Sequence, residues 1–196
     1  MSRASYRQTK KASRAGGGKI IFVYIVINRQ DGDIIIMTSF EDIKSFITCK
    51  KVISRPPKRI PKDENRCWRN DMELTTSDGS EHFSVFMRQS QILPDNFSIG
   101  LRWHCQETGK WITLIRCNGP HGGNKSIAYH NAPHMHLLAE KDYNSDSTNY
   151  PTRVNTDVNY KTYDEAIAYF CVYCGIQDAD KYFPQILSIS LFPDEN

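Results

Sequence analysis

The chain has 196 residues, of which 39% are hydrophobic and 24% are charged, and its net charge is +3. This length and composition indicate one globular domain and exclude a wholly disordered chain. The small positive charge does not by itself point to nucleic acid. No apolar run approaches the ~20 residues that a membrane helix needs, and no cleavage site follows the apolar stretch 20–27. We therefore expect a cytoplasmic protein that does not enter a membrane.

Residues 1–18 are rich in basic residues, lack acidic ones and end in a run of glycines. This composition predicts a disordered basic tail, which is either a solvated arm or an arm that neutralises the phosphates of a nucleic acid. The candidate phosphate-binding residues of the tail are Lys10, Lys11 and Arg14.

Two β-branched runs follow at 19–28 and 33–38, and the Asp31-Gly32 pair between them is a strong hairpin signal. A capping pattern and apolar residues at helical spacing then predict a helix over 40–49.

Residues 50–81 are basic and contain several prolines, which exclude a helix interior and a central strand where they stand. We interpret this segment as a connector, either a solvated linker or a loop that follows a nucleic-acid backbone. Its candidate nucleic-acid-binding residues are Lys50, Lys51, Arg55, Lys58 and Arg59.

The second half of the chain shows alternating apolar residues between turn signals, which predicts an antiparallel meander. A capping box marks the start of one further helix. In chain order we expect strands at 82–90, 97–105 and 110–117, a strand at 134–139, a polar loop at 141–160, a helix at 162–174 and a strand at 186–192.

These elements predict the α+β class, with an antiparallel sheet of about six strands and two packed helices. After the tail, residues 19–196 would form a single domain. Within it, 19–60 is a hairpin–helix element, and 82–192 contains the main sheet and the C-terminal helix.

The six cysteines are expected to be reduced thiols, because the chain shows no secretion signal and is longer than typical disulfide scaffolds. Cys171 and Cys174 have the CxxC spacing of redox and zinc sites. They lie on the apolar face near the C-terminal end of the predicted helix, where the helix dipole disfavours a thiolate. We therefore interpret both as core residues.

Four of the six histidines lie between positions 121 and 136. His134 and His136 would project to the same face of a strand, with Cα atoms ~7 Å apart. Two such imidazoles suit a transition-metal site or a pair of acid and base catalysts, or they are surface residues of a half-exposed strand. His121, in a glycine-rich loop, would join them, and Arg116 would bind a phosphate where the strand enters that loop.

Glu140 completes the pattern His134-x-His136-x-x-x-Glu140, which resembles the first metal motif of cupins and would ligate a divalent transition metal. The second cupin motif has no counterpart, because no histidine follows His136. The alternating histidines also resemble those of the histidine-triad nucleotide hydrolases, although Leu138 occupies the third position.

A broader resemblance spans residues 95–176. Its motifs are RCNGPHG at 116–122 and PHMH at 133–136, followed by the helix that contains Glu165. In combination these motifs resemble an uncharacterised family of small bacterial and phage proteins. The resemblance implies relatives but no activity.

We favour a phosphodiester-cleaving enzyme that acts on RNA or a nucleotide in a toxin–antitoxin or phage-defence setting. Its catalytic residues would be His121, His134, His136 and Arg116. One alternative is a non-enzymatic phage-encoded inhibitor, similar to anti-CRISPR proteins, that binds a nucleoprotein complex. The other is a metal-stabilised binding module. The expected partners are RNA, DNA or a nucleoprotein complex.

Overall fold

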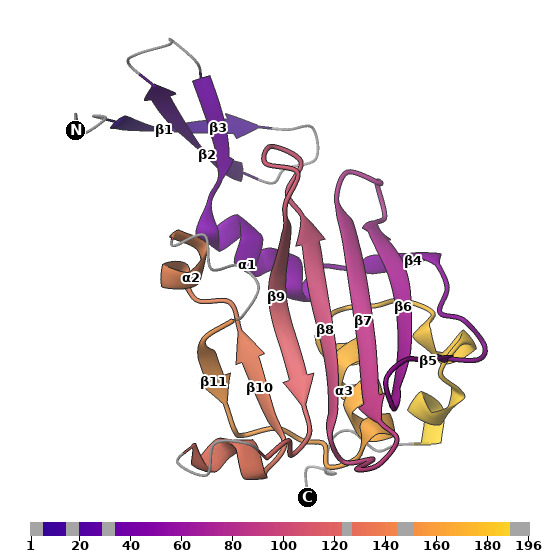
Figure 1. Cartoon of the computed structure of the whole chain (residues 1–196). Coiled ribbons are helices and arrows are strands. Elements are labelled where there is room, and N and C mark those ends of the chain that lie inside the picture. Colours follow the sequence, from indigo (N-terminus) through magenta and orange to yellow (C-terminus); the bar gives the residue numbers. More distant parts are fainter. Residues whose placement is uncertain (1–5, 15–19, 29–33, 123–126, 145–150, 189–196) are drawn as a thin grey trace, which may run out of the picture.

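The computed structural model describes residues 6–14, 20–28, 34–122, 127–144 and 151–188. Within these ranges the chain forms an eight-stranded sheet, a separate three-stranded sheet and helices, which confirms the α+β class (Figure 1). All strand pairs within the two sheets are antiparallel.

The main sheet contains β4 (Lys51–Arg55), β5 (Lys62–Asp63), β6 (Cys67–Thr76), β7 (His82–Ser90), β8 (Phe97–His104), β9 (Trp111–Asn118), β10 (His134–Leu137) and β11 (Arg153–Asn155). The strands lie in the order β11-β10-β9-β8-β7-β6-β4, and β5 pairs with β6. The helices are α1 (Phe40–Thr48), α2 (Glu140–Asn144) and α3 (Tyr163–Tyr173), with short 3-10 helices η1 (Ala128–Asn131), η2 (Ala179–Lys181) and η3 (Pro184–Ser188).

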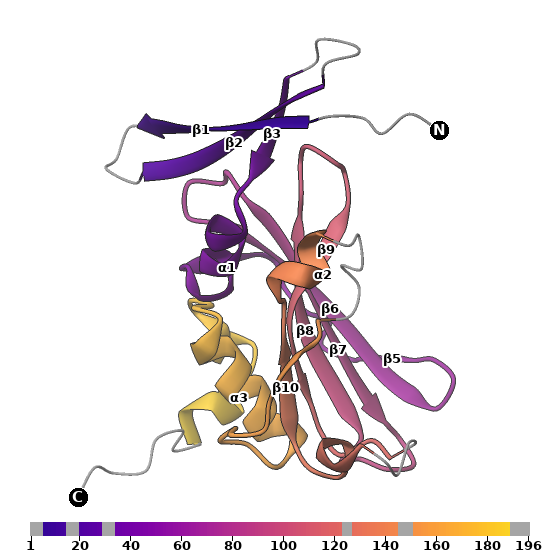
Figure 2. The ribbon, with the colours of Figure 1, turned by 90° about the vertical axis from the view of Figure 1, so that its left-hand side faces the viewer.

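One face of the main sheet is covered by α1 and α3, and its other face is left open by them (Figure 2). Alternate residues of the central strands, such as Val85, Leu101 and Ile115, are fully buried in the core between sheet and helices. The residues between them point to the opposite face, which we call the open face. The polar residues of the central strands therefore gather there.

The two long helices begin where the capping patterns predict. The Ser39 side chain accepts a hydrogen bond from the Asp42 N–H at the start of α1. Thr162 and Glu165 form a reciprocal capping box at the start of α3. Gly175 follows α3 with a positive φ of 65°, which explains why the helix ends there.

The position of Lys51 contradicts one prediction from the sequence. This residue was expected to bind nucleic acid, but its side chain is fully buried. Its ammonium group donates three hydrogen bonds of 2.8–3.0 Å, to the carbonyl oxygens of Ile47, Cys49 and Cys174. These carbonyls belong to the C-terminal ends of α1 and α3, where helix dipoles favour a cation. Burial lowers the pKa of Lys51, and the three bonds use every proton of its ammonium group.

The N-terminal strands also differ from expectation. β2 (Ile20–Asn28) and β3 (Ile34–Thr38) form the predicted hairpin, but they pair with β1 (Tyr6–Arg14) in the three-stranded sheet and not in the main sheet. Part of the segment predicted as a disordered tail is thus a strand, because pairing with β2 requires only backbone groups. The rest of that segment lies outside the described residues.

Three other segments differ from the sequence prediction, and two of them contain more regular structure than their composition indicates. Residues 50–81 hold β4, β5 and the ten-residue β6, because their prolines fall between the strands. The predicted loop 141–160 contains most of α2 and all of β11. The strand predicted at 186–192 is wrong for residues 186–188, which belong to η3, and its remainder lies outside the described residues.

The two CxxC cysteines are buried and free, as predicted. Burial raises the pKa of both thiols, to about 12 for Cys174. A thiol with such a pKa carries almost no thiolate at neutral pH, so neither cysteine is a reactive nucleophile.

We predict that Lys51→Met lowers the free energy of unfolding by about 2–4 kcal/mol, because three buried carbonyl groups lose their donor. Lys50→Met is the matched control, since the Lys50 side chain is exposed. It should change stability by less than about 0.5 kcal/mol. Urea denaturation of the three proteins measures both values, and equal stabilities of the two variants would contradict the role of Lys51.

Candidate metal centre

The pairing of β10 with β9 fixes two histidines on the open face. His134 is opposite Asn118 and His136 is opposite Arg116 in this antiparallel pair. Since alternate residues share a face, both imidazoles project away from the core, while Met135 between them is buried in it. His134 is itself fully buried, because the segments after β9 cover it.

Two short segments bring the covering histidines into place. His121 follows β9, and its backbone N–H donates a 3.0 Å hydrogen bond to the carbonyl of His130 in η1. Gly119 allows this path, because a Cβ at that position would collide with the Asp95 carbonyl and the Phe97 ring. The backbone after β9 therefore passes close to residues 95–97, and the hydrogen bond of His121 joins it to η1.

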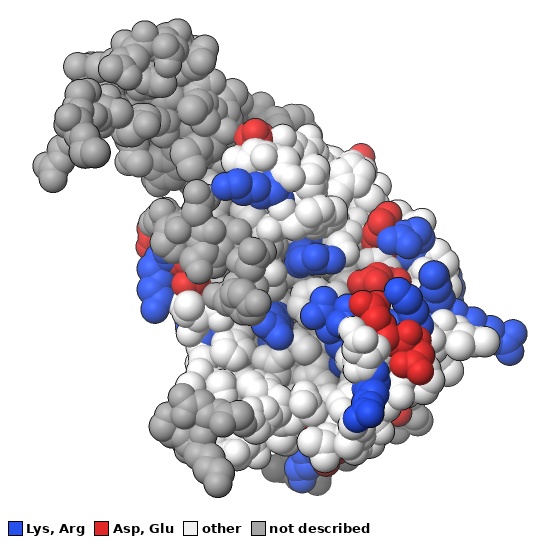
Figure 3. Space-filling view, in the orientation of Figure 1, with Lys and Arg blue, Asp and Glu red and all other residues white. Residues whose placement is uncertain are grey.

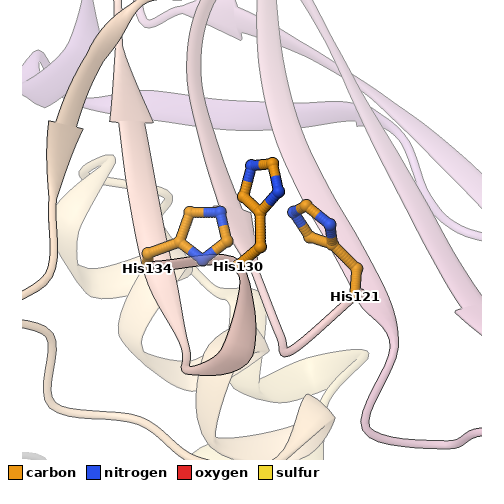
Figure 4. A group of neighbouring side chains, drawn as sticks. All are labelled: His121, His130 and His134. Atoms are coloured by element: carbon orange, nitrogen blue, oxygen red, sulfur yellow. The ribbon is translucent and has the colours of Figure 1, made fainter. Parts of the chain in front are cut away.

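Three imidazoles converge at this point. His121, His130 and His134 each offer a ring nitrogen, and these nitrogens all lie within 4.8 Å of one another. Their ring centroids are 4.3–5.7 Å apart, and Figure 4 shows the rings turned toward one another. Three neutral imidazoles in such an arrangement could hold a metal ion.

Backbone carbonyls set the orientation of two rings. The Nδ1 atom of His134 is 2.8 Å from the Ala132 carbonyl oxygen, and that of His136 is 3.0 Å from the Pro151 carbonyl oxygen. A carbonyl only accepts, so each Nδ1 carries the proton and each Nε2 is unprotonated, with a lone pair that can accept a hydrogen bond or bind a metal. Histidine ligands of metals typically donate their other N–H in this way.

Asp142 secures the segment that orients His136. Its buried carboxylate accepts hydrogen bonds from the backbone N–H groups of Ala139 and Thr152 and from the Thr152 hydroxyl. Thr152 follows Pro151 directly, so α2 holds in place the carbonyl that receives the His136 proton.

The environment favours neutral rings. Burial lowers the pKa of His121, His134 and His136, in the last case to about 4. The neighbouring histidines and the positive charge of Arg116 lower the same pKa values further. Neutral imidazole is the form that ligates a metal.

The structure thus brings together the four predicted catalytic residues, His121, His134, His136 and Arg116. The predicted metal set is different: His136 lies beside the group, with its ring centroid 5.0 Å from that of His134, and is not one of the three convergent histidines. Glu140 is exposed at the start of α2 and does not belong to the group either.

Sequence reasoning missed His130 as a ligand. It lies in a 3-10 helix, so no strand periodicity relates it to His134. The signal that could have found it was the density of histidines between 121 and 136. Tyr129, beside it in η1, was missed too, and its ring contacts the rings of His130, His134 and His136.

The other predicted nucleic-acid-binding residues lie in β1 and in residues 50–59, where Arg55 and Lys58 line one pocket with Arg88. Lys10, Lys11 and Arg14 lie in β1. Lys50, Arg55, Lys58 and Arg59 are exposed, and Arg55 forms a 2.6 Å ion pair with Glu73.

Comparison with protein-family models, with curated proteins and with solved structures finds no match for this chain. The resemblance to a bacterial and phage family therefore stays a prediction. Among the described residues, no helix has the length and apolar character needed to cross a bilayer.

The lowered pKa values predict how the stability of the metal-free protein depends on pH. A histidine in the unfolded chain has a pKa of about 6.5, so below that pH the unfolded state binds more protons than the folded state does. The free energy of unfolding should therefore be highest above about pH 6.5 and fall as the pH drops toward the folded pKa of His136, about 4. Urea denaturation with a chelator, between about pH 6.5 and 5, measures this slope before most carboxylates titrate.

The matched variants are His136→Asn and His82→Asn. His82 is an exposed histidine in β7 and controls for the loss of one imidazole, so His136→Asn should reduce the slope more than His82→Asn does. A wild-type protein whose stability is constant over this range would contradict the lowered pKa values.

Proposed function

We propose that the protein is a metal-dependent hydrolase of phosphodiesters. The observation that carries the proposal is the convergence of ring nitrogens from His121, His130 and His134 within 4.8 Å. Zinc sites with three protein ligands typically keep a fourth position for water and are catalytic, whereas structural zinc sites are closed by four protein ligands.

The pKa directions favour metal ligation over catalysis by an acid–base pair of histidines. An acid–base pair needs one imidazole that is protonated near neutral pH. The pKa values of His121, His134 and His136 are all lowered, so these rings are neutral at that pH. Asn118 approaches His134 Nε2 only at 3.5 Å, a long contact that a metal ion would replace.

Phosphate is the substrate group that fits the surroundings. Arg116 is opposite His136 in the β9–β10 pair and carries a permanent charge in a geometry that suits phosphate. A divalent metal at the three histidines would activate water near neutral pH. Water would then add to phosphorus, the ester oxygen would leave with a proton, and Arg116 would stabilise the charge on the phosphoryl oxygens.

Metal binding is the first test. We expect the purified protein to bind one Zn²⁺ or Co²⁺ per chain in calorimetric titration. At a free metal concentration of 100 times Kd, the melting temperature should rise by about 5–10 °C. His121→Ala and His130→Ala should abolish tight binding, because each removes one convergent nitrogen.

The controls for metal binding are His82→Ala, an exposed histidine in β7, and His136→Ala, which lies beside the group. Both should keep the stoichiometry of the wild type. Equal metal binding by the wild type, His121→Ala and His130→Ala would contradict the proposed centre.

Hydrolysis is the second test. The metal-loaded protein should cleave bis(p-nitrophenyl) phosphate and an oligouridylate, and a chelator or His130→Ala should abolish both activities. Arg116→Lys should keep the metal but lower kcat by about 10²-fold or more, since a point charge replaces the planar guanidinium.

Two outcomes would overturn the proposed hydrolase. Cleavage that persists both in the presence of the chelator and in His130→Ala would show that the reaction does not use a metal at this site. Metal binding with the expected thermal shift but no cleavage of either substrate would instead support the metal-stabilised binding module.

A further inference from the structure

The open face of the main sheet carries three arginines around one aromatic ring. Arg88, Arg102 and Arg116 lie on the adjacent strands β7, β8 and β9. Their guanidinium carbons are 5.2, 5.5 and 5.9 Å from the centre of the Phe86 ring. Because guanidinium groups are attracted to aromatic faces, the Phe86 ring gathers three positive charges on one part of the open face.

A glycine makes the arrangement possible. Phe86 is opposite Gly100, which is in turn opposite Arg116. A Cβ on Gly100 would collide with the Phe86 ring, so the ring lies across the glycine and forms a platform for the arginines. Phe86 itself is only 9% exposed.

The carboxylates nearest to these arginines lie on and beside β6: Asp71 is opposite Phe86, and the Glu64 carboxylate is attracted by the charge of Arg88. Among the described residues, no carboxylate lies within ion-pair distance of Arg88 or Arg102. Glu73 and Glu64, acidic residues on and beside β6, pair with Arg55 and with Lys62 and Arg69 respectively. Figure 3 shows basic side chains over the middle of the open face, with the acidic ones gathered toward one side.

An exposed aromatic ring stands beside the arginines. Trp111 in β9 is 39% exposed, lies 5.7 Å from the guanidinium carbon of Arg102, and contacts the ring of His104. Its indole could accept a stacked base. A base has a free π-face of this kind when it is unpaired, as in a single strand.

We propose that the open face binds single-stranded nucleic acid. Arg88, Arg102 and Arg116 contact successive phosphates, and Trp111 stacks on a base. Arg116 is common to this surface and to the surroundings of the histidines, so a bound strand passes the candidate metal centre. The proposal extends the proposed hydrolase by defining its substrate, but binding itself requires no metal.

Fluorescence anisotropy in excess chelator tests the binding face. The probes are fluorescein-labelled 15-nucleotide oligouridylate and oligothymidylate, with a duplex of the same length for comparison. The wild type should bind both single strands more tightly than the duplex. The Arg88→Gln/Arg102→Gln double variant should bind them at least tenfold more weakly. The slope of its salt dependence should fall by about 1.4, because each arginine that neutralises a phosphate of a single strand accounts for about 0.7.

The matched control is Lys44→Gln/Lys161→Gln, which makes the same change in net charge at exposed positions on α1 and before α3. The affinity of this control for the single strands should lie within twofold of the wild-type affinity. Trp111→Ala should weaken single-strand binding about tenfold and leave the weaker duplex binding unchanged. Melting temperatures of the variants should match that of the wild type, which shows that each is folded.

Several results would overturn the binding face. These are no binding of single strands, an equal loss of affinity in both double variants, preference for the duplex, or tighter binding of an acidic or phosphorylated peptide. The outcome is separable from the hydrolase test. If His130→Ala still binds the oligonucleotides, the binding face is supported even when hydrolysis is lost. If the wild type cleaves bis(p-nitrophenyl) phosphate but does not bind the oligonucleotides, the binding face is wrong and the hydrolase proposal stands.

Discussion

One-sided coverage of the main sheet is the constraint on which the other features depend. Because α1 and α3 pack on a single face, alternate residues of every central strand must be apolar, and the residues between them reach the open face. The polar and charged groups of neighbouring strands are thereby collected on one surface. The three arginines around Phe86 lie on the open face because of this alternation, and so does His134 of the histidine cluster.

The helices that create this asymmetry are held together by Lys51. Its ammonium group joins the C-terminal ends of α1 and α3, and its backbone N–H bonds to Gly175. A buried cation normally costs several kcal/mol, but here two helix dipoles and three carbonyl oxygens compensate. The same residue anchors β4, the strand at one edge of the sheet. Lysine is usually exposed at a protein surface, but Lys51 is part of the structural core.

Register and chain reversal assemble the candidate metal centre. The pairing of β10 with β9 places His134 and His136 beside Asn118 and Arg116, and the segments on either side of residues 123–126 bring His121 and His130 beside His134. Backbone carbonyls orient the rings of His134 and His136, so the part of the site on β10 is supported by the sheet and its neighbouring backbone. Such support suits a site that must keep its geometry while ligands bind.

The sequence alone determined the α+β class, the strand positions of the meander, both helix caps and the burial of Cys171 and Cys174, because alternation, capping and apolar faces are local patterns. Local patterns also placed His134 and His136 on one face. Only the tertiary structure separated β2 and β3 from the main sheet, buried Lys51 and brought His130 to His121. These features depend on contacts between residues distant in the chain, which a local pattern does not encode. Lys51 shows the reason most plainly: its position in sequence indicates a basic surface segment, while its environment is made by the end of a helix 123 residues away.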